Sequence, residues 1–236
     1  MIILLTNDDG IDAVGINTLY QQLIAKHEVW MIAPRYPMNA SSHAITIGKE
    51  IRVEPRNSKI FAVHGTPADC VLLGVNDIMP YRPELVVSGI NAGPNLGDDV
   101  TYSGTVGAAM EGVIWGITSM SVSIMEPLLD YWQEASVWVD KLIACVERLP
   151  QPVLLNINIP PQPKGVKVTR LGKRTYENIV TKKSDYIYVL GGNPVAHPAE
   201  GTDMAAVRDG YIAVTPLRID ITDDDILSRV RAVIRV

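Results

Sequence analysis

Cysteine is scarce in this sequence: its 236 residues include only Cys70 and Cys145. The two show neither a disulfide-framework spacing nor a zinc-binding spacing, and histidine and cysteine form no cluster near the polar loops. A disulfide-stabilised secreted domain and a structural zinc site are therefore excluded. We expect the protein to function in the reducing cytoplasm.

An excess of basic residues is also absent, since 26 acidic residues outnumber 21 lysines and arginines, for a formal net charge of −5. This balance argues against a partner that is a nucleic-acid polymer or a membrane surface. It leaves room for a small anionic substrate, because a metal ion or a set of backbone amides can outweigh the global charge locally. No apolar run approaches transmembrane length, and the apolar start is too short for a signal peptide. We therefore expect no membrane partner.

The first ten residues are the stretch around which the chain is organised. Four consecutive aliphatic residues, 2–5, predict a strand buried on both faces, as in a parallel sheet. The turn-forming run 7–10 follows at once and holds Asp8 and Asp9. In an open α/β sheet this carboxyl end of a strand is where ligands bind. Adjacent carboxylates repel unless a cation lies between them or one is protonated. Two interpretations of Asp8 and Asp9 therefore remain possible at this point: a turn with a helix cap, or a cation site.

The rest of the chain alternates helix and strand up to residue 160, which predicts an α/β, Rossmann-like three-layer domain with a mostly parallel sheet. The region 161–236 is rich in strands and irregular, so we expect a smaller β-rich C-terminal extension, with a protruding hairpin or loop at 173–184. Acids before arginines in 223–236 predict a terminal helix. The predicted strands are 29–33, 45–54, 60–63, 84–88, 119–124, 153–159, 166–171, 186–190 and 211–216, and the predicted helices are 14–26 and 131–149.

Three further segments carry polar side chains at strand or helix ends. The loop 35–43 follows the second strand, and the Gly- and Asn-rich loop 89–99 follows the strand 84–88. A helix then begins at Ser103, whose first turn offers free amides and hydroxyls for an anion, although Ser-Gly-Thr is more often only a cap. Residues 66–69 form another helix start, which we interpret as a cap with no further role.

Together these strand ends place oxygen ligands at one edge of the predicted sheet. Carboxylate and amide oxygens suit a hard divalent cation, Mg²⁺ or Mn²⁺. A metal beside a helix N-terminus is an arrangement that handles phosphate. The residues that we expect there are Asp8 and Asp9, the Asn39 region, Asn91, Asn95, Ser103, Gly104 and Thr105.

These residues lie in motifs that resemble the survival protein SurE family of nucleotidases. The matching motifs are LTNDDG at 5–10, AP at 33–34, GTPADCV at 65–71, VVSGINAGPN at 86–95, YSGTV at 102–106, EG at 111–112, GTD at 201–203 and GYIAVTPL at 210–217. The resemblance covers essentially the whole chain, and the run 89–112 is highly specific. It implies one divalent metal and a homodimer or homotetramer assembled partly by exchanged C-terminal segments.

The resemblance also assigns roles to individual residues. It makes Asp8 and Asp9 the catalytic residues and, with Asn91 and Asn39, the metal ligands; Asn39 stands where the family has serine. From the residues themselves we predict that Asn95, Ser103, Gly104 and Thr105 form the phosphate pocket, the alternative being that Ser103 only caps a helix. Ser41 or Ser42 could replace Asn39 as the ligand, and Arg35 stands where the family has an acid.

The function implied is metal-dependent hydrolysis of nucleoside 5′-monophosphates to nucleoside and phosphate, with 3′-nucleotides and short polyphosphate as further candidate substrates. One alternative is a nucleotide- or metal-binding protein whose turnover is weakened by the altered loop 35–42. Another is a phosphatase for a different small phosphate ester.

Overall fold

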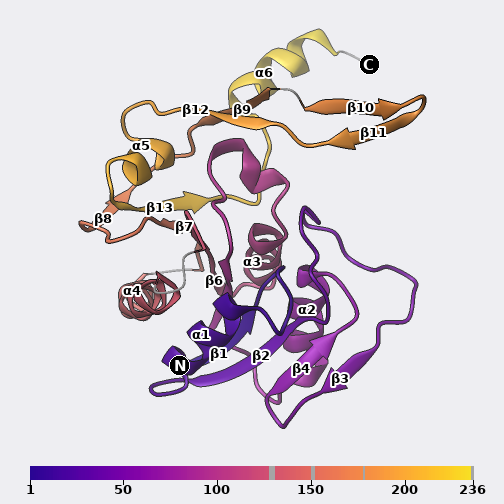
Figure 1. The fold of residues 1–236 in the computed structure, drawn as a ribbon, viewed down its shortest axis with the longest axis vertical. Helices are drawn as coiled ribbons and strands as arrows, with labels where there is room; N and C mark the ends of the chain where they lie inside the picture. Colours follow the sequence, from indigo (N-terminus) through magenta and orange to yellow (C-terminus); the bar gives the residue numbers. More distant parts are fainter. Residues whose placement is uncertain (128–130, 150–151, 178, 235–236) are drawn as a thin grey trace.

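A computed structural model describes residues 1–127, 131–149, 152–177 and 179–234. Its centre is a nine-stranded sheet with the strand order β3-β4-β2-β1-β5-β6-β7-β13-β8 (Figure 1). The strands of this sheet are β1 (Ile2–Thr6), β2 (Glu28–Pro34), β3 (Val53–Pro55), β4 (Ile60–Val63), β5 (Leu85–Asn91), β6 (Thr118–Ile124), β7 (Leu154–Ile159), β8 (Val166–Val168) and β13 (Ile212–Leu217).

The six strands β4, β2, β1, β5, β6 and β7 run parallel, as the apolar runs predict. In β1 the side chains of Ile3 and Leu5 enter one core cluster and that of Leu4 enters another on the opposite face. Both faces of β1 are therefore buried, which explains why its sequence is continuously aliphatic rather than alternating.

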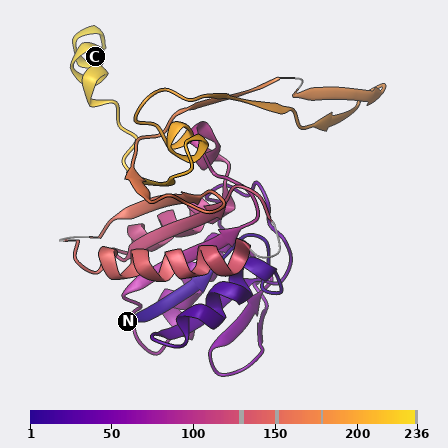
Figure 2. The same ribbon diagram turned by 60° about the vertical axis from the view of Figure 1, so that its left-hand side comes forward.

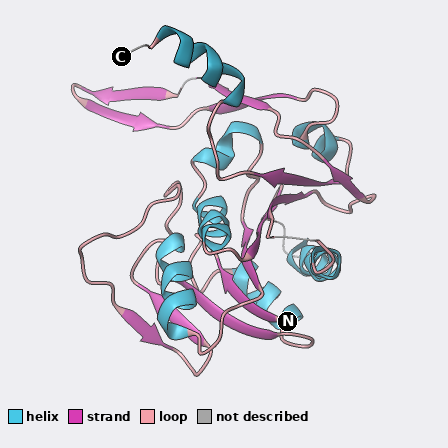
Figure 3. Cartoon of the chain, turned by 180° about the vertical axis from the view of Figure 1, so that it is seen from behind, coloured by secondary structure: helices cyan, strands magenta, loops and turns pink. Residues whose placement is uncertain are grey.

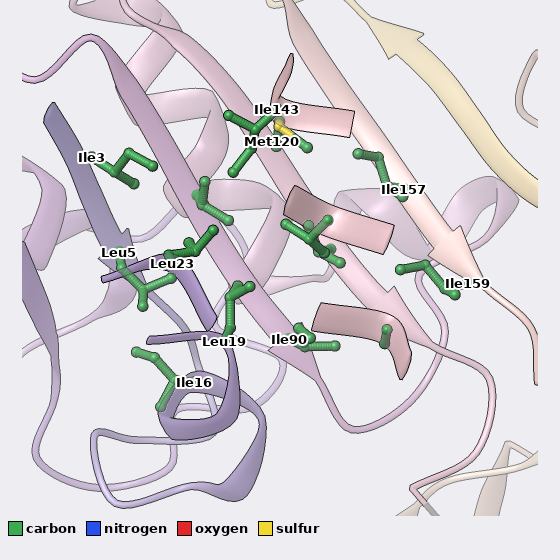
Figure 4. Packing of buried hydrophobic residues seen from close by; sticks show 14 of the residues in the cluster. Ile3, Leu5, Ile16, Leu19, Leu23, Ile90, Met120, Ile143, Ile157 and Ile159 are labelled. Carbon is green, nitrogen blue, oxygen red and sulfur yellow. The ribbon is translucent and has the colours of Figure 1, made fainter. Parts of the chain in front are cut away.

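Helices cover both faces of the sheet and produce three layers (Figure 3). The helices α1 (Val14–Leu23) and α4 (Tyr131–Val146) pack on one face, where Leu19, Leu23 and Ile143 join Ile3, Leu5 and Met120 in the larger core cluster (Figure 4). The helices α2 (Pro67–Leu73) and α3 (Gly104–Ile114) cover the other face and are joined to their neighbours by the short segments η1 (Gly74–Ile78) and η2 (Gly97–Thr101). The α/β, Rossmann-like prediction is confirmed.

The strand order reverses at β1. The chain passes from β1 through α1 to β2 on one side, and later returns to β5 on the other side. A crevice opens at the carboxyl ends of strands where such a reversal occurs. The loops after β1, β2 and β5 therefore meet at one place.

The C-terminal part is small and β-rich, as expected. It adds β13 antiparallel to β7 and β8 parallel to β13 at the edge of the main sheet, and the helix α5 (Asp203–Arg208) lies between these strands in the sequence. A long arm of two strand pairs projects from the body (Figure 2). Its strands are β9 (Lys173–Glu177), β10 (Val180–Ser184), β11 (Ile187–Leu190) and β12 (Asn193–His197), and the terminal helix is α6 (Asp224–Val233).

The expected projection at 173–184 is thus the outgoing half of a longer arm. The division of the chain at residue 160 stays a prediction. Every helix in the described ranges falls short of the length and hydrophobicity that crossing a membrane requires.

The predicted strand 45–54 is wrong over most of its length, because only Val53–Pro55 is extended and paired. The reason lies in Thr46: its backbone amide and its hydroxyl both donate to the carboxylate of Asp69, at 2.8 and 2.7 Å. A backbone donor used in this way is lost to a strand ladder.

Candidate functional site

A cavity of about 350 Å³ lies at the carboxyl ends of β1 and β5, beside the N-terminus of α3. It is lined by Asp8, Asp9, Asn39, Ala40, Asn91, Ala92, Pro94, Asn95, Asp99, Tyr102, Ser103 and Tyr176. Six of the eight residues expected from the sequence therefore line one cavity. The other two, Gly104 and Thr105, lie behind Asp8 and do not line it.

The two adjacent acids are held by the turn after β1. Gly10 has φ +96°, a conformation that glycine adopts without strain, and its carbonyl accepts from Asn7 Nδ2 at 2.9 Å. Asp8 accepts from the hydroxyl of Thr105 at 2.5 Å and from its amide at 3.1 Å, whereas Asp9 accepts from the amide of Ala92 at 3.0 Å. Each carboxylate is thus oriented by a different loop.

Burial raises the pKa of both acids. The pKa of Asp8 rises to about 6, because burial outweighs the lowering effect of the Thr105 hydrogen bonds and the charge of Asp9 raises it further. The pKa of Asp9 is also raised by burial, against the hydrogen bond from Ala92. Within the described ranges neither acid forms an ion pair with a basic side chain. Two adjacent carboxylates, one buried and one half-buried, with no protein cation beside them are suited to bind a metal ion.

The neighbouring amides supply the further oxygen ligands that a hard cation needs. Asn91 donates its amide nitrogen to the carbonyl of Gly93 at 2.8 Å, which leaves its amide oxygen to accept or to ligate. Four buried oxygens have no hydrogen-bond partner in the part of the chain described, namely Thr6 Oγ1, Asn7 Oδ1, Ser41 Oγ and Ser88 Oγ. The described residues contain no cluster of three or more His, Cys, Asp or Glu side chains. A site of two carboxylates completed by amides fits Mg²⁺ or Mn²⁺ rather than zinc.

The N-terminus of α3 closes one side of the cavity. Ser103 is its cap, with the hydroxyl oxygen accepting from the amide of Val106 at 3.1 Å. A Cβ on Gly104 would lie 2.4 Å from Ser41 Oγ and 3.0 Å from Asp8 Cβ, so a side chain does not fit there. The glycine thus allows α3 to approach Asp8 and the loop after β2 at the same time.

The loop after β2 is fixed in place by α2 and α3. His43 Nε2 lies 2.6 Å from Glu111 Oε2 on α3, and Ser42 Oγ donates to the carbonyl of Thr101 at 2.7 Å. Asp69 at the start of α2 receives the two bonds from Thr46 described above. Our interpretation of residues 66–69 as only a cap is therefore incomplete. The capping box forms, and Asp69 in addition holds the loop that carries Asn39.

Arg35 stands at the position where an acid was expected from the resemblance, and it does not line the cavity. Its guanidinium forms an ion pair with Asp12 at 2.9 Å and lies 3.8 Å from Glu54. Its positive charge is therefore balanced by acids outside the site.

Asn95 is held by two asparagines that sequence reasoning missed. The backbone N–H of Asn95 donates to Asn158 Oδ1 at 2.9 Å. Its backbone carbonyl oxygen accepts from the side-chain nitrogens of Asn156 and Asn158 at 2.8 and 2.9 Å. Its own side-chain nitrogen donates to Ser123 Oγ at 2.8 Å. The signal was present, because two asparagines within the apolar strand 153–159 are unexpected unless they bind a partner.

The second acidic pair, at 98–99, binds the arm. Asp99 pairs with Arg174 Nη1 at 2.5 Å and accepts from the hydroxyl of Tyr176 at 2.7 Å, and Asp98 lies 3.2 Å from Lys173 Nζ. Sequence reasoning missed Tyr176, because only the folded arm brings it to the cavity.

Comparisons with known proteins show which family this chain resembles over its length. A family model described as survival protein SurE matches residues 3–178. A protein from Pelotomaculum thermopropionicum named 5′-nucleotidase SurE is 43% identical, over 100% of this chain and 96% of its own. One of the same name from Pseudoalteromonas atlantica is 41% identical, over 98% of both chains. The crystal structure of the SurE protein from Aquifex aeolicus superposes with a TM-score of 0.88 at 38% identity, over 99% of both chains.

Proposed function

The chain belongs to the survival protein SurE family, and on that premise we propose that it is a metal-dependent 5′-nucleotidase, a phosphoric monoester hydrolase. The observation that carries the proposal is the shared cavity. Asp8 and Asp9 line it together with amide side chains and the capped N-terminus of α3. Such a cavity combines a cation site with an anion site, which is what a phosphate ester requires.

We propose that Asp8, Asp9, Asn91 and Asn39 would hold one divalent ion, Mg²⁺ or Mn²⁺. Asn39 lines the cavity with the other three residues, and its amide oxygen is an ordinary ligand for such ions. When bound, the cation supplies charge neutralisation and polarises a phosphoryl oxygen.

The chain's own residues bind and orient the phosphate. Ser103 uses its hydroxyl oxygen as an acceptor for the helix cap, so its O–H remains to donate to a phosphate oxygen. The dipole of α3, which begins at Gly104 behind Asp8, attracts the same group. Thr105 uses its hydroxyl and its amide to orient Asp8. The bonds from Asn156 and Asn158 fix the backbone of Asn95 beside these donors.

We further propose a homodimer or homotetramer that uses the arm and the C-terminal helix. None of the residues of α6 is buried, although Ile226, Val230 and Val233 form an apolar stripe along it. On the arm, Leu190 is 75% exposed. Apolar surface of this kind indicates a protein partner, and sedimentation as a monomer at micromolar concentration would contradict the assignment. The free thiols of Cys70 and Cys145 accord with our placement of the protein in the cytoplasm.

Phosphate release tests the catalytic assignment. We expect Mn²⁺-dependent release from nucleoside 5′-monophosphates, loss of release in EDTA, and a loss of at least a hundredfold in Asp9→Asn, since removal of an electrostatic group typically has an effect of this size. Asp77→Asn, which replaces an exposed aspartate on η1, is the matched control. The same panel should include 3′-nucleotides, ribose 5-phosphate and short polyphosphate.

The panel also separates the rival functions. Binding of Mn²⁺ and nucleotide by calorimetry without release of phosphate would favour a binding protein. Preference for ribose 5-phosphate or polyphosphate over every nucleotide would favour another phosphatase.

A further inference from the structure

Two tyrosines from distant parts of the chain line the candidate cavity. Tyr102 follows η2 directly, and Tyr176 belongs to β9 of the arm. Tyr102 is 67% exposed and Tyr176 37%, whereas Asp8 and Ser103 in the same cavity are 4% and 7% exposed. Asp8 and Ser103 therefore lie deep in the cavity, and the two aromatic rings lie toward its open end.

The ring of Tyr176 is held in place by its polar end. Its hydroxyl donates to Asp99, which also pairs with Arg174, and the Arg174 guanidinium lies 5.6 Å from the ring centroid. Arg174 thus covers one face of the ring. In the described part of the chain neither Tyr102 nor Tyr176 stacks on another aromatic side chain. Because the ring is already held in one orientation, little side-chain entropy is lost when a flat ligand stacks on its other face.

This arrangement is more than an anchor for the arm. The ion pairs of Asp98 and Asp99 with Lys173 and Arg174 already attach β9 to the body. Attachment alone does not require an aromatic ring in the cavity wall, and Tyr102, which lines the same wall, does not belong to the arm at all.

We propose that Tyr102 and Tyr176 form the nucleobase platform of this site, so that its preferred substrates carry an aromatic base. The inference rests on the proposed function and adds to it the group that recognises the substrate beyond its phosphate. Stacking on aromatic side chains tolerates any base, because every base has a π-face. The platform therefore favours nucleotides over sugar phosphates and polyphosphate, with only modest preference among bases.

The test compares AMP with ribose 5-phosphate, which has the same phosphate and sugar but no base. The measured quantity is the ratio of kcat/KM for AMP to kcat/KM for ribose 5-phosphate, in Mn²⁺. We expect Tyr176→Ala and Tyr102→Ala each to lower this ratio roughly ten- to hundredfold, the size of one lost base–aromatic contact, chiefly through the KM for AMP. Tyr176→Phe, which keeps the ring and loses the bond to Asp99, should retain most of the ratio. Tyr81→Ala is the matched control, because Tyr81 is 57% exposed and does not line the cavity.

The outcomes separate the two proposals. Equal losses on both substrates in the alanine variants, which leave the ratio unchanged, would show a structural role for the tyrosines and overturn the platform. An unchanged ratio without loss of activity would overturn it as well. If the natural protein releases phosphate from neither substrate, the proposed function fails, and the platform is tested by calorimetry. Weaker binding of AMP to Tyr176→Ala than to the natural protein would then support it, and equal binding would refute it.

Discussion

Replacement of Asp8 by asparagine should stabilise the metal-free protein at neutral pH. The folded pKa of Asp8, about 6, lies above its unfolded value of 3.8. A group of this kind stabilises the fold fully below pH 3.8, and the contribution is lost as the pH rises through about 6. At about 1.36 kcal/mol per pKa unit, the ionised carboxylate lowers the free energy of unfolding by about 3 kcal/mol above pH 7.

Asparagine imitates the neutral form of the acid at this position. Its amide oxygen can accept from the amide of Thr105, and its nitrogen can donate to the Thr105 hydroxyl, so both contacts of the carboxylate can be retained. In EDTA at pH 7.5 we therefore expect the free energy of unfolding of Asp8→Asn to be about 3 kcal/mol higher than that of the natural protein. This corresponds to a rise in Tm of roughly 6–12 °C for a chain of this length. Near pH 4 the difference should nearly vanish, because the natural side chain is then neutral.

The assay is thermal or urea unfolding from pH 4 to 8, with and without Mn²⁺. Mn²⁺ at a thousand times its Kd should reverse the order, because a ligand at that concentration stabilises the natural protein by about 4.1 kcal/mol, whereas the variant has lost a charged ligand. Asp77→Asn should show neither effect. A lower Tm for Asp8→Asn in EDTA at pH 7.5, or a difference independent of pH, would refute the assignment of a destabilising buried charge at Asp8.

Two further substitutions test the loop after β2. In Asp69→Asn the bonds from Thr46 and Thr66 weaken, so we expect roughly tenfold weaker Mn²⁺ binding by calorimetry in addition to a lower Tm; unaltered affinity would show that the loop keeps its place without Asp69. Asn39→Ser exchanges one neutral oxygen ligand for another, so the rate on AMP should change by tenfold or less, about 1.4 kcal/mol. An inactive natural protein that serine at position 39 restores would instead indicate that Asn39 disables the site.

Local sequence determined the elements that place the two acids. Four aliphatic residues followed by a turn predicted a buried strand with its polar end at the edge of the sheet, and the neighbours of Ser103 predicted a helix start there. Such signals are readable because backbone preference and burial depend on residues close together in the chain. They also sufficed to bring Asp8, Asp9, Asn39 and Asn91 to one edge before any contact was known.

Contacts between distant segments were decided only by the tertiary structure. The stretch 45–52 has the alternation of a strand, yet a carboxylate on α2 takes the hydrogen bonds that a ladder would need. The sequence does not show what the acidic pair 98–99 contacts, and in the structure the arm brings Arg174 and Tyr176 to Asp99. The pKa of Asp8 likewise depends on how completely the loop after β2 and α3 exclude water from it. Burial and charge pairing of this kind depend on many residues that are far away in the sequence, so local sequence patterns do not predict them.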